Sequence, residues 1–214
     1  PVRGEKQLTF NYARVMVDKV TSYLMSGTTF AVDPVADTDA AKESAKKAEQ
    51  ELFQVYEQNN LEQLDLDTEI DCAILGDACY KVTWDQQTDR VRVTAPDIQG
   101  IYAWWVGDDI SRIWRIASRY TLSADETELL YHITPKSKTA NLVEVWTETT
   151  FSLYLDNTLL ESKPNPYGFI PFIVYPNLRE PKKFWGVSDI PQIMQPQTEL
   201  NRAMSQLSRI LELS

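Results

Sequence analysis

Apolar residues near the start of the chain recur at spacings of three and four positions. This period is typical of a helix with one buried face and predicts an amphipathic helix over residues 8–26, ended by Gly27. The recurring positions are Phe10, Ala13, Val17, Val20 and Leu24. The stretch from Thr28 to Val32 is short, β-prone and closed by Asp33-Pro34, so we expect a brief strand or an extended link there.

Two further helices are predicted next. Residues 38–58 are rich in Ala, Lys and Glu, begin at a capping residue, Thr38 or Asp39, and carry one apolar stripe, which predicts a helix with a mostly solvated face. Asn59-Asn60 interrupts this pattern, and residues 61–76 predict a second helix with acidic residues between its apolar positions. We expect these two helices to pack as a pair.

From Ala78 the apolar period changes to two, which is the period of a half-buried strand. Tyr80, Val82 and Trp84 alternate with polar residues, a turn follows, and the alternation resumes, so a hairpin is predicted. Similar short runs predict further strands at 100–106, 112–121, 129–133, 142–149, 151–155, 159–161 and 172–175. The sequence therefore predicts an α+β fold in which the N-terminal helices pack on an antiparallel meander over about residues 79–175.

The helical period returns at the C-terminal end of the chain. Ser188-Asp189 is a suitable cap, and a helix is predicted over residues 188–214. Its apolar face carries Leu200, Met204, Leu207 and Leu211. Pro196 lacks a backbone N–H, so we expect a kink or a break there. Because the helical pattern still runs at Ser214, we expect the chain to be a piece of a longer protein.

Composition narrows the possible functions. The chain has 214 residues, of which 43% are hydrophobic, and a net charge of −10. Proteins that grip nucleic acid neutralise its phosphates with clustered Lys and Arg, so this acidic chain is not expected to hold DNA in that way. An acidic balance is compatible with a protein that surrounds DNA while the duplex slides past it.

The sequence contains no motif that indicates a metal site, a cofactor site or a membrane-spanning segment. Cys72 and Cys79 form no CxxC motif, and His132 is the only histidine, so we expect two buried reduced thiols, no metal site and no cofactor. The acidic run 65–77 lacks the glycine and glutamate positions of an EF-hand, which favours a solvated helix face. No apolar stretch is long enough to cross a membrane, and the N-terminus has no signal-peptide pattern.

The usual catalytic motifs are missing as well, so we expect no enzyme. The sequence has no Gly-rich phosphate loop and no GxSxG motif, and His132 lies in a predicted strand. Asp97 with Glu161 and Lys163 imitates part of a two-metal nuclease site, but the long separation favours turn residues beside strands. In the Trp104-Trp105 pair, one ring is expected in the core and the other at an interface rather than stacked on bases.

Three local signatures resemble the portal proteins of tailed bacteriophages, in particular those of long-tailed phages with an α/β wing domain. The first is Asn11-Tyr-Ala-Arg-Val-Met-Val-Asp followed by Tyr23-Leu-Met-Ser-Gly27. The second is Gly76-Asp-Ala-Cys-Tyr80, where a helix bends into a hairpin. The third runs from Gly168-Phe-Ile-Pro171 through Trp185-Gly-Val-Ser-Asp-Ile190 to Gln197, Asn201 and Ser205. Pro196 departs from the family's uninterrupted helix.

This resemblance implies a structural role and a division into two parts. Residues 1–187 would form the wing and residues 188–214 the start of a truncated stem helix, without the clip and the crown. The full-length protein would form a ring of about twelve copies at the capsid vertex, whereas the isolated fragment would be monomeric. Double-stranded DNA would pass through the ring during packaging and ejection without sequence-specific binding.

The resemblance also implies partners and locations. The partners are terminase, the head-tail connector and capsid proteins, with no membrane contact. The locations are the portal vertex of the virion and, during assembly, the host cytoplasm.

Eight residues are candidates for structural or subunit-interface roles. The glycines would serve backbone geometry, the Ser-Asp pair would cap the C-terminal helix, and the remaining residues would contact neighbouring subunits. They are Gly27, Gly76, Gly186, Ser188, Asp189, Asn201, Arg202 and Arg209. Two alternatives stay open: an acidic β-rich adaptor or binding module that forms no ring, and the metal-dependent nuclease.

Overall fold

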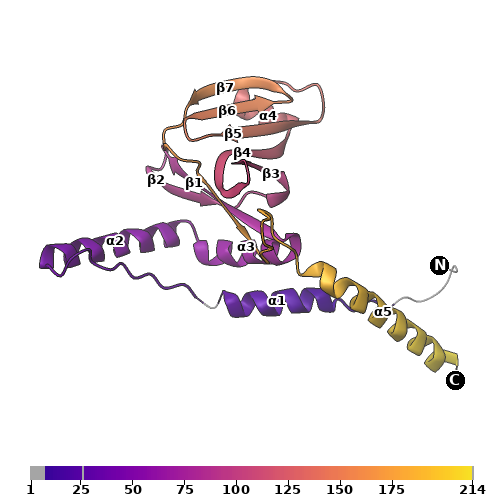
Figure 1. Cartoon of the computed structure of the whole chain (residues 1–214). Coiled ribbons are helices and arrows are strands. Elements are labelled where there is room, and N and C mark those ends of the chain that lie inside the picture. Colours follow the sequence, from indigo (N-terminus) through magenta and orange to yellow (C-terminus); the bar gives the residue numbers. More distant parts are fainter. Residues whose placement is uncertain (1–7, 26, 214) are drawn as a thin grey trace.

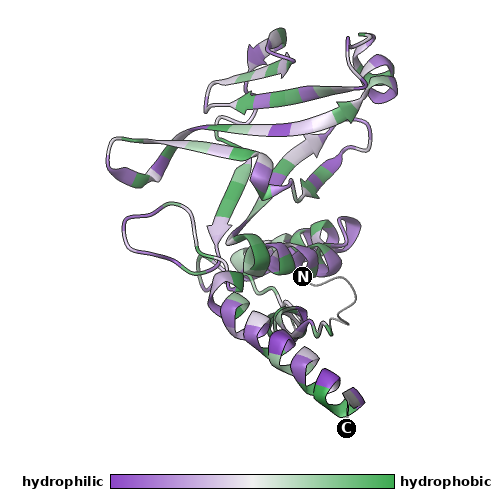
Figure 2. Cartoon of the chain, turned by 90° about the vertical axis from the view of Figure 1, so that its right-hand side faces the viewer, coloured by the Kyte–Doolittle hydropathy of each residue, from purple (hydrophilic) through white to green (hydrophobic). Residues whose placement is uncertain are grey.

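The computed structural model describes residues 8–25 and 27–213 of the chain (Figure 1). Helices form the lower layer, two antiparallel sheets lie above them, and the C-terminal helix α5 runs away from this body. Figure 2 shows the same arrangement from the side, with the strands stacked over the helices. The predicted α+β fold class is therefore confirmed.

The first helix, α1, spans Tyr12–Leu24 and begins after Asn11, whose Oδ1 accepts the backbone N–H of Arg14 at 3.1 Å. The predicted start at residue 8 is wrong, because the chain before Asn11 is extended and hydrogen-bonded to α5. The predicted end at Ser26 lies outside the described residues. No strand forms between Gly27 and Thr38, so the expected link there is extended chain without a sheet partner.

The next two helices agree with their predicted ranges. Helix α2 spans Asp39–Gln58 and is capped by the hydroxyl of Thr38, which accepts the N–H of Ala41. Helix α3 spans Leu61–Leu75 and is entered through Asn60 in the left-handed region, with φ of +48°. The predicted solvated face of α3 holds only in part, because the Asp65 carboxylate accepts hydrogen bonds from the hydroxyls of Tyr56 and Tyr80.

The predicted hairpin belongs to a separate sheet. Its strands, β1 (Asp77–Asp85) and β2 (Arg90–Thr94), pair with β8 (Phe172–Pro176) in the order β2-β1-β8. Helix α3 packs on β1, so the helices rest on this small sheet. The chain then leaves it through the short 3-10 helix η1 (Ile98–Gly100) and enters the meander.

The meander itself is a five-stranded sheet whose strands follow one another in sequence order. The strands are β3 (Ile101–Val106), β4 (Asp109–Ser123), β5 (Thr139–Trp146), β6 (Thr150–Leu155) and β7 (Thr158–Pro164). Burial alternates strictly along β5 and β6, as the period-two pattern requires. One face of this sheet therefore covers the core and the other faces away from it.

The predicted strand at 129–133 is wrong. This segment belongs to α4 (Ala124–Tyr131), which starts with a reciprocal capping box between Ser123 and Glu126. His132 follows in the left-handed region with φ of +56° and ends the helix. The alternation of apolar residues misled the prediction because Tyr131 and Ile133 both pack against the core although only one of them is helical.

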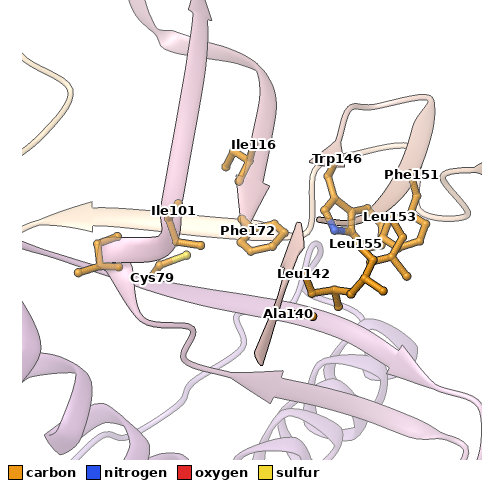
Figure 3. Packing of buried hydrophobic residues seen from close by; sticks show 11 residues of the cluster. Cys79, Ile101, Ile116, Ala140, Leu142, Trp146, Phe151, Leu153, Leu155 and Phe172 are labelled. Carbon is orange, nitrogen blue, oxygen red and sulfur yellow. The ribbon is translucent and has the colours of Figure 1, made fainter. Parts of the chain in front are cut away.

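The core lies between the two sheets and contains one buried ion pair. Ile116, Leu142 and Ala140 are fully buried, and Trp146 and Phe172 close the cluster from the two sheets (Figure 3). Lys81 of β1 pairs with the Glu144 carboxylate of β5, which also accepts hydrogen bonds from Trp146 Nε1 (3.0 Å) and the Tyr120 hydroxyl (3.2 Å). The Glu144 carboxylate, with three side chains as its partners, thus connects the small sheet to the large one.

The two cysteines are buried free thiols, Cys72 on α3 and Cys79 on β1. Burial raises the pKa of each thiol to about 12. We expect neither to react with a thiol reagent at pH 8 in the native protein, and both to react after unfolding in guanidinium. The unfolded thiols ionise near pH 9 while the folded ones keep their protons, so their contribution to stability should be present below pH 9 and decline as pH rises toward 12.

A reaction of either cysteine in the native protein at pH 8 would contradict this expectation. Guanidinium titrations between pH 8 and 11 measure the stability directly, and variants with Ser at each position separate the thiol contribution from that of buried tyrosines. One of these, Tyr80, has its pKa raised by burial and by its hydrogen bond to Asp65.

Candidate functional site at the root of the C-terminal helix

The C-terminal helix α5 spans Ile190–Leu213 and stays one continuous element. Of the kink or break expected at Pro196, the break does not occur. Because a proline lacks only its own N–H, the helix loses one intrahelical hydrogen bond, to the carbonyl of Gln192, and the remaining ladder continues. The predicted end of this helix at Ser214 lies outside the described residues.

Gly76 is the residue on which three segments meet. It ends α3 with φ of +97°, a backbone conformation that glycine adopts without steric cost. Its N–H donates to the Cys72 carbonyl at 2.8 Å, and its own carbonyl accepts the N–H of Asn177, just after β8, at 2.9 Å. The end of α3 is thereby joined to the end of β8.

Ser188 and Asp189 connect the last turn of α3 with the first turn of α5. The Ser188 hydroxyl accepts the N–H of Ile190 at 3.0 Å and lies within hydrogen-bond distance of the Ala73 and Ile74 carbonyls. The N–H of Asp189 donates to the Ala73 carbonyl at 3.0 Å. The last carbonyls of a helix have no intrahelical partner, so the start of α5 supplies the missing donors for α3.

Gly186 approaches Gly76 too closely for a side chain on either residue. A Cβ on Gly76 would lie 2.9 Å from the backbone nitrogen of Ser188, and a Cβ on Gly186 would lie 2.6 Å from Cβ of Pro176 and would overlap the Gly76 carbonyl. The N–H of Gly186 donates to Asp77 Oδ1 at 2.8 Å. Two backbones therefore cross here in direct contact.

Carboxylates surround this crossing, and burial disfavours their ionised form. Burial raises the pKa of Asp77, although the hydrogen bond from the Gly186 N–H opposes this shift. Burial and the charge of Asp189 raise the pKa of Glu69. The Asp77 carboxylate accepts the N–H of Gly186, and the Cys72 thiol among these carboxylates keeps its proton at neutral pH because burial raises its pKa to about 12.

Four of the predicted site residues thus meet at one place, which we call the junction: Gly76, Gly186, Ser188 and Asp189. The sequence suggested each of them separately as a glycine or a cap. It carried no signal that the end of α3 and the start of α5, more than a hundred positions apart, form one hydrogen-bonded unit.

A second feature of α5 was missed by sequence reasoning. Residues 8–11, which we call the arm, lie extended along α5, and their backbone, together with that of Tyr12 at the start of α1, pairs with side chains spaced four positions apart on α5. The N–H groups of Leu8, Phe10 and Tyr12 donate to Ser205 Oγ (3.0 Å), Asn201 Oδ1 (2.9 Å) and Gln197 Oε1 (2.9 Å), respectively. The Gln197 side-chain amide also donates back to the Phe10 carbonyl.

The arm and the helix match in spacing. Four helical residues rise about 6 Å, and two extended residues span about 6.7 Å, so each second backbone N–H of the arm meets each fourth side chain of α5. This pairing explains why Gln197, Asn201 and Ser205 recur at that interval. Asn201, proposed from the sequence for contacts with neighbouring subunits, therefore binds the arm of its own chain.

The other candidate residues lie apart from the junction. Gly27, with φ of +125°, lines a cavity of about 470 Å³ next to Phe53 and Tyr56. Arg202 pairs with Glu199 at 3.4 Å on the exposed surface of α5, and Arg209 follows one heptad later on the same side of the helix.

The nuclease residues are not brought together. Asp97 caps η1 beside β3, whereas Glu161 and Lys163 pair with each other at 3.0 Å on β7, at the opposite edge of the five-stranded sheet. Four strand spacings separate these edges by about 19 Å. Across residues 8–25 and 27–213, no cluster of three His, Cys, Asp or Glu side chains is arranged to hold a metal ion.

A family model described as "Phage portal protein, SPP1 Gp6-like" matches residues 2–213, almost the whole chain. The search of curated proteins gave no significant match. Among the helices of the described part of the chain, none has both the length and the apolar character required to cross a membrane.

Proposed function

Because the chain belongs to the SPP1 Gp6-like family of phage portal proteins, we propose that its copies stand side by side in a ring of about twelve at the capsid vertex. The family is structural, and the role of this chain is that of a structural component of the virion. In this proposal, residues 1–187 form the wing and residues 188–214 the first part of the stem. The ring encloses the channel through which double-stranded DNA is packaged and ejected.

The observation that carries this proposal is the apolar surface that α1 and α5 leave uncovered. Leu200, Leu207 and Leu211 follow one flank of α5, and Leu207 and Leu211 are 49% and 68% exposed. Figure 2 shows green apolar segments along α5 toward its C-terminal end. Contiguous apolar surface of this kind on a soluble protein marks a contact with another protein.

Helix α1 adds a second uncovered stripe. Tyr12, Met16, Val20 and Tyr23 recur at three and four positions and are each about half exposed or more, while Val17 and Thr21 face the interior. Two different apolar faces on one subunit suit a heterologous contact, in which one face of a copy meets the other face of its neighbour. Such contacts close into a ring when the rotation between copies permits it.

Charge supports the same proposal. On α5 the exposed Arg202 and Arg209 lie on the side away from the leucine flank, where they are available to a neighbouring subunit in addition to their own-chain contacts. The net charge of −10 suits a channel wall that must not retain DNA by neutralising its phosphates. Terminase, the head-tail connector and capsid proteins are the proposed partners of the assembled ring, in the virion and in the host cytoplasm during assembly.

The test is assembly of the full-length protein, since the isolated fragment is expected to be monomeric. We expect uniform rings in negative-stain micrographs, and we expect the double variant Leu207→Glu/Leu211→Glu to reduce ring formation at least tenfold, because it places charges in the leucine flank. The matched control is Val35→Glu, at a fully exposed position in the loop before α2, which should assemble normally.

Two results would contradict the proposal. One is a wild-type protein that stays monomeric or dimeric at all concentrations, which would favour the adaptor alternative. The other is ring formation by the double variant at the wild-type level. Circular dichroism separates failure to assemble from failure to fold.

A further inference from the structure

The outer face of the five-stranded sheet differs from the rest of this acidic chain. In strands β3 to β7, the residues that point away from the core include Tyr102, Arg119, Val143 and Tyr154, and they alternate with buried residues. Away from the hairpin tip at 107–109, none of the outward strand positions is Asp or Glu. A carboxylate-free face with arginines is unusual in a chain with 31 acidic residues.

The arginines on this face are held by aromatic rings. The guanidinium carbon of Arg115 lies 3.9 Å from the ring centre of Trp104 and 4.6 Å from that of Trp114, and Arg119 lies 5.6 Å from the ring centre of Tyr102. Trp104 and Arg115 are direct partners across β3 and β4, and the register shift after Trp104 brings Trp114 to the same place. Such contacts fix the guanidinium groups in position.

These guanidinium groups have no anionic partner within residues 8–25 and 27–213. Neither the Arg115 side chain nor the Arg119 side chain forms a hydrogen bond or an ion pair within these residues, and the buried Nε of Arg115 has no hydrogen-bond partner among them. The buried Nε is out of reach of an outside acceptor, but the terminal guanidinium nitrogens of Arg115 are not buried and stay available as donors. The rings cover the guanidinium planes, which leaves the in-plane N–H groups as the available donors.

The chemistry favours carboxylates over nucleic acid as the acceptors. In-plane guanidinium donors match the two oxygens of a carboxylate. Arg115 already covers one face of Trp104 and one face of Trp114, which reduces the ring surface available for stacking on bases. The net charge of −10 also repels a long polyanion, while two isolated carboxylates meet only the local positive charge.

We propose that this face binds an extended acidic segment of a partner protein, with one carboxylate on Arg115 and one on Arg119. The two arginines are four positions apart on β4, which corresponds to about 13 Å along the strand. An extended segment with acidic residues at the same interval presents its carboxylates at the same distance. The exposed rings of Tyr102 and Trp104 supply apolar contact between them.

The experiment uses a short synthetic peptide of Thr and Val with two Glu residues four positions apart. Binding to the native protein at low salt is followed by calorimetry and by the fluorescence of the tryptophans beside Arg115. We expect saturable binding that weakens at least tenfold with a Gln-for-Glu peptide, weakens at least tenfold in Arg119→Gln, and falls as salt rises. The control variant Arg90→Gln, on the other sheet, should bind normally.

Arg119 is chosen because Arg115 also holds two tryptophans and its variant could disturb the fold. Three outcomes would overturn the proposal: no binding of the Glu peptide at millimolar concentration, equal binding of the Gln peptide or by Arg119→Gln, and tighter binding of an oligothymidylate than of the Glu peptide. Ring formation lost in Arg119→Gln without any peptide binding would instead assign the face to a second copy of the chain. The proposal does not depend on ring formation.

Discussion

Replacing Gly76 with alanine should lower the free energy of unfolding by about 3 kcal/mol. The positive φ of +97° contributes about 1 kcal/mol, because an L residue is strained there. The overlap of the new Cβ with the Ser188 nitrogen at 2.9 Å and the Gly186 carbonyl at 3.1 Å contributes about 2 kcal/mol, because both neighbours are backbone atoms that cannot rotate away. Urea titration of the native protein and the variant measures the difference.

Gly107→Ala is the matched control for this prediction. Gly107 also has a positive φ, of +60°, but nothing lies within 4 Å of its added Cβ. Its variant should lose only about 1 kcal/mol, the cost of backbone strain alone. Equal losses for the two variants would contradict the argument, since the backbone crossing at the junction would then have no energetic role.

Gly186→Ala extends the same argument to the other side of the crossing. Because the two glycines contact each other, the double variant should lose less than the sum of the single variants: once one backbone has shifted, the second overlap costs less. We also expect protease cleavage to increase in the loop before α5, since the Asp189 and Ser188 hydrogen bonds to α3 depend on this contact.

Local patterns were sufficient for most elements of the fold. Periodicity and capping residues predict helices α2 and α3 and the alternating strands β5 and β6. Each of these elements buries one face, and this produces the regular spacing of apolar residues from which the element is predicted. The strand at 129–133 failed because alternation alone cannot distinguish a strand from a helix end followed by an extended residue. The Ser-x-x-Glu capping box at Ser123 was the signal that could have corrected it.

Contacts between distant parts of the chain could not be predicted in this way. The assignment of β1 and β2 to a sheet with β8 depends on pairing across about ninety positions, for instance between Lys81 and Phe172. The arm on α5 is a similar case, since Leu8 and Ser205 are 197 positions apart. The interval of Gln197, Asn201 and Ser205 was visible in the sequence, but a polar stripe on a helix does not reveal that its partner is the backbone of an extended segment.

The candidate site was therefore predicted as residues but not as a structure. Gly76, Gly186 and Ser188 stood out as a turn glycine, a loop glycine and a cap, each of which is a local feature. Their meeting place follows from the topology, because β1 starts directly after α3 and β8 returns beside β1. The arginine and tryptophan face was likewise hidden, because the register shift that adds Trp114 to it is a tertiary feature.

Replacing Lys81 with methionine should lower the free energy of unfolding by about 3 kcal/mol or more. The ion pair with Glu144 is largely shielded from water, with side chains only 19% and 12% exposed, so the variant leaves a buried carboxylate without its cation. Removing one partner of such a pair is strongly destabilising. The remaining hydrogen bonds from Trp146 and Tyr120 are neutral and cannot replace the lost charge.

The double variant Lys81→Met/Glu144→Gln separates this effect from lost packing. A glutamine oxygen still accepts the hydrogen bonds from Trp146 and Tyr120 but carries no charge, so the double variant should be more stable than Lys81→Met alone. The exposed pair of Lys163 and Glu161 on β7 is the matched control, and Lys163→Met should change stability by less than about 1 kcal/mol. A double variant no more stable than Lys81→Met would contradict this argument, because removal of the unpaired Glu144 charge would then give no gain.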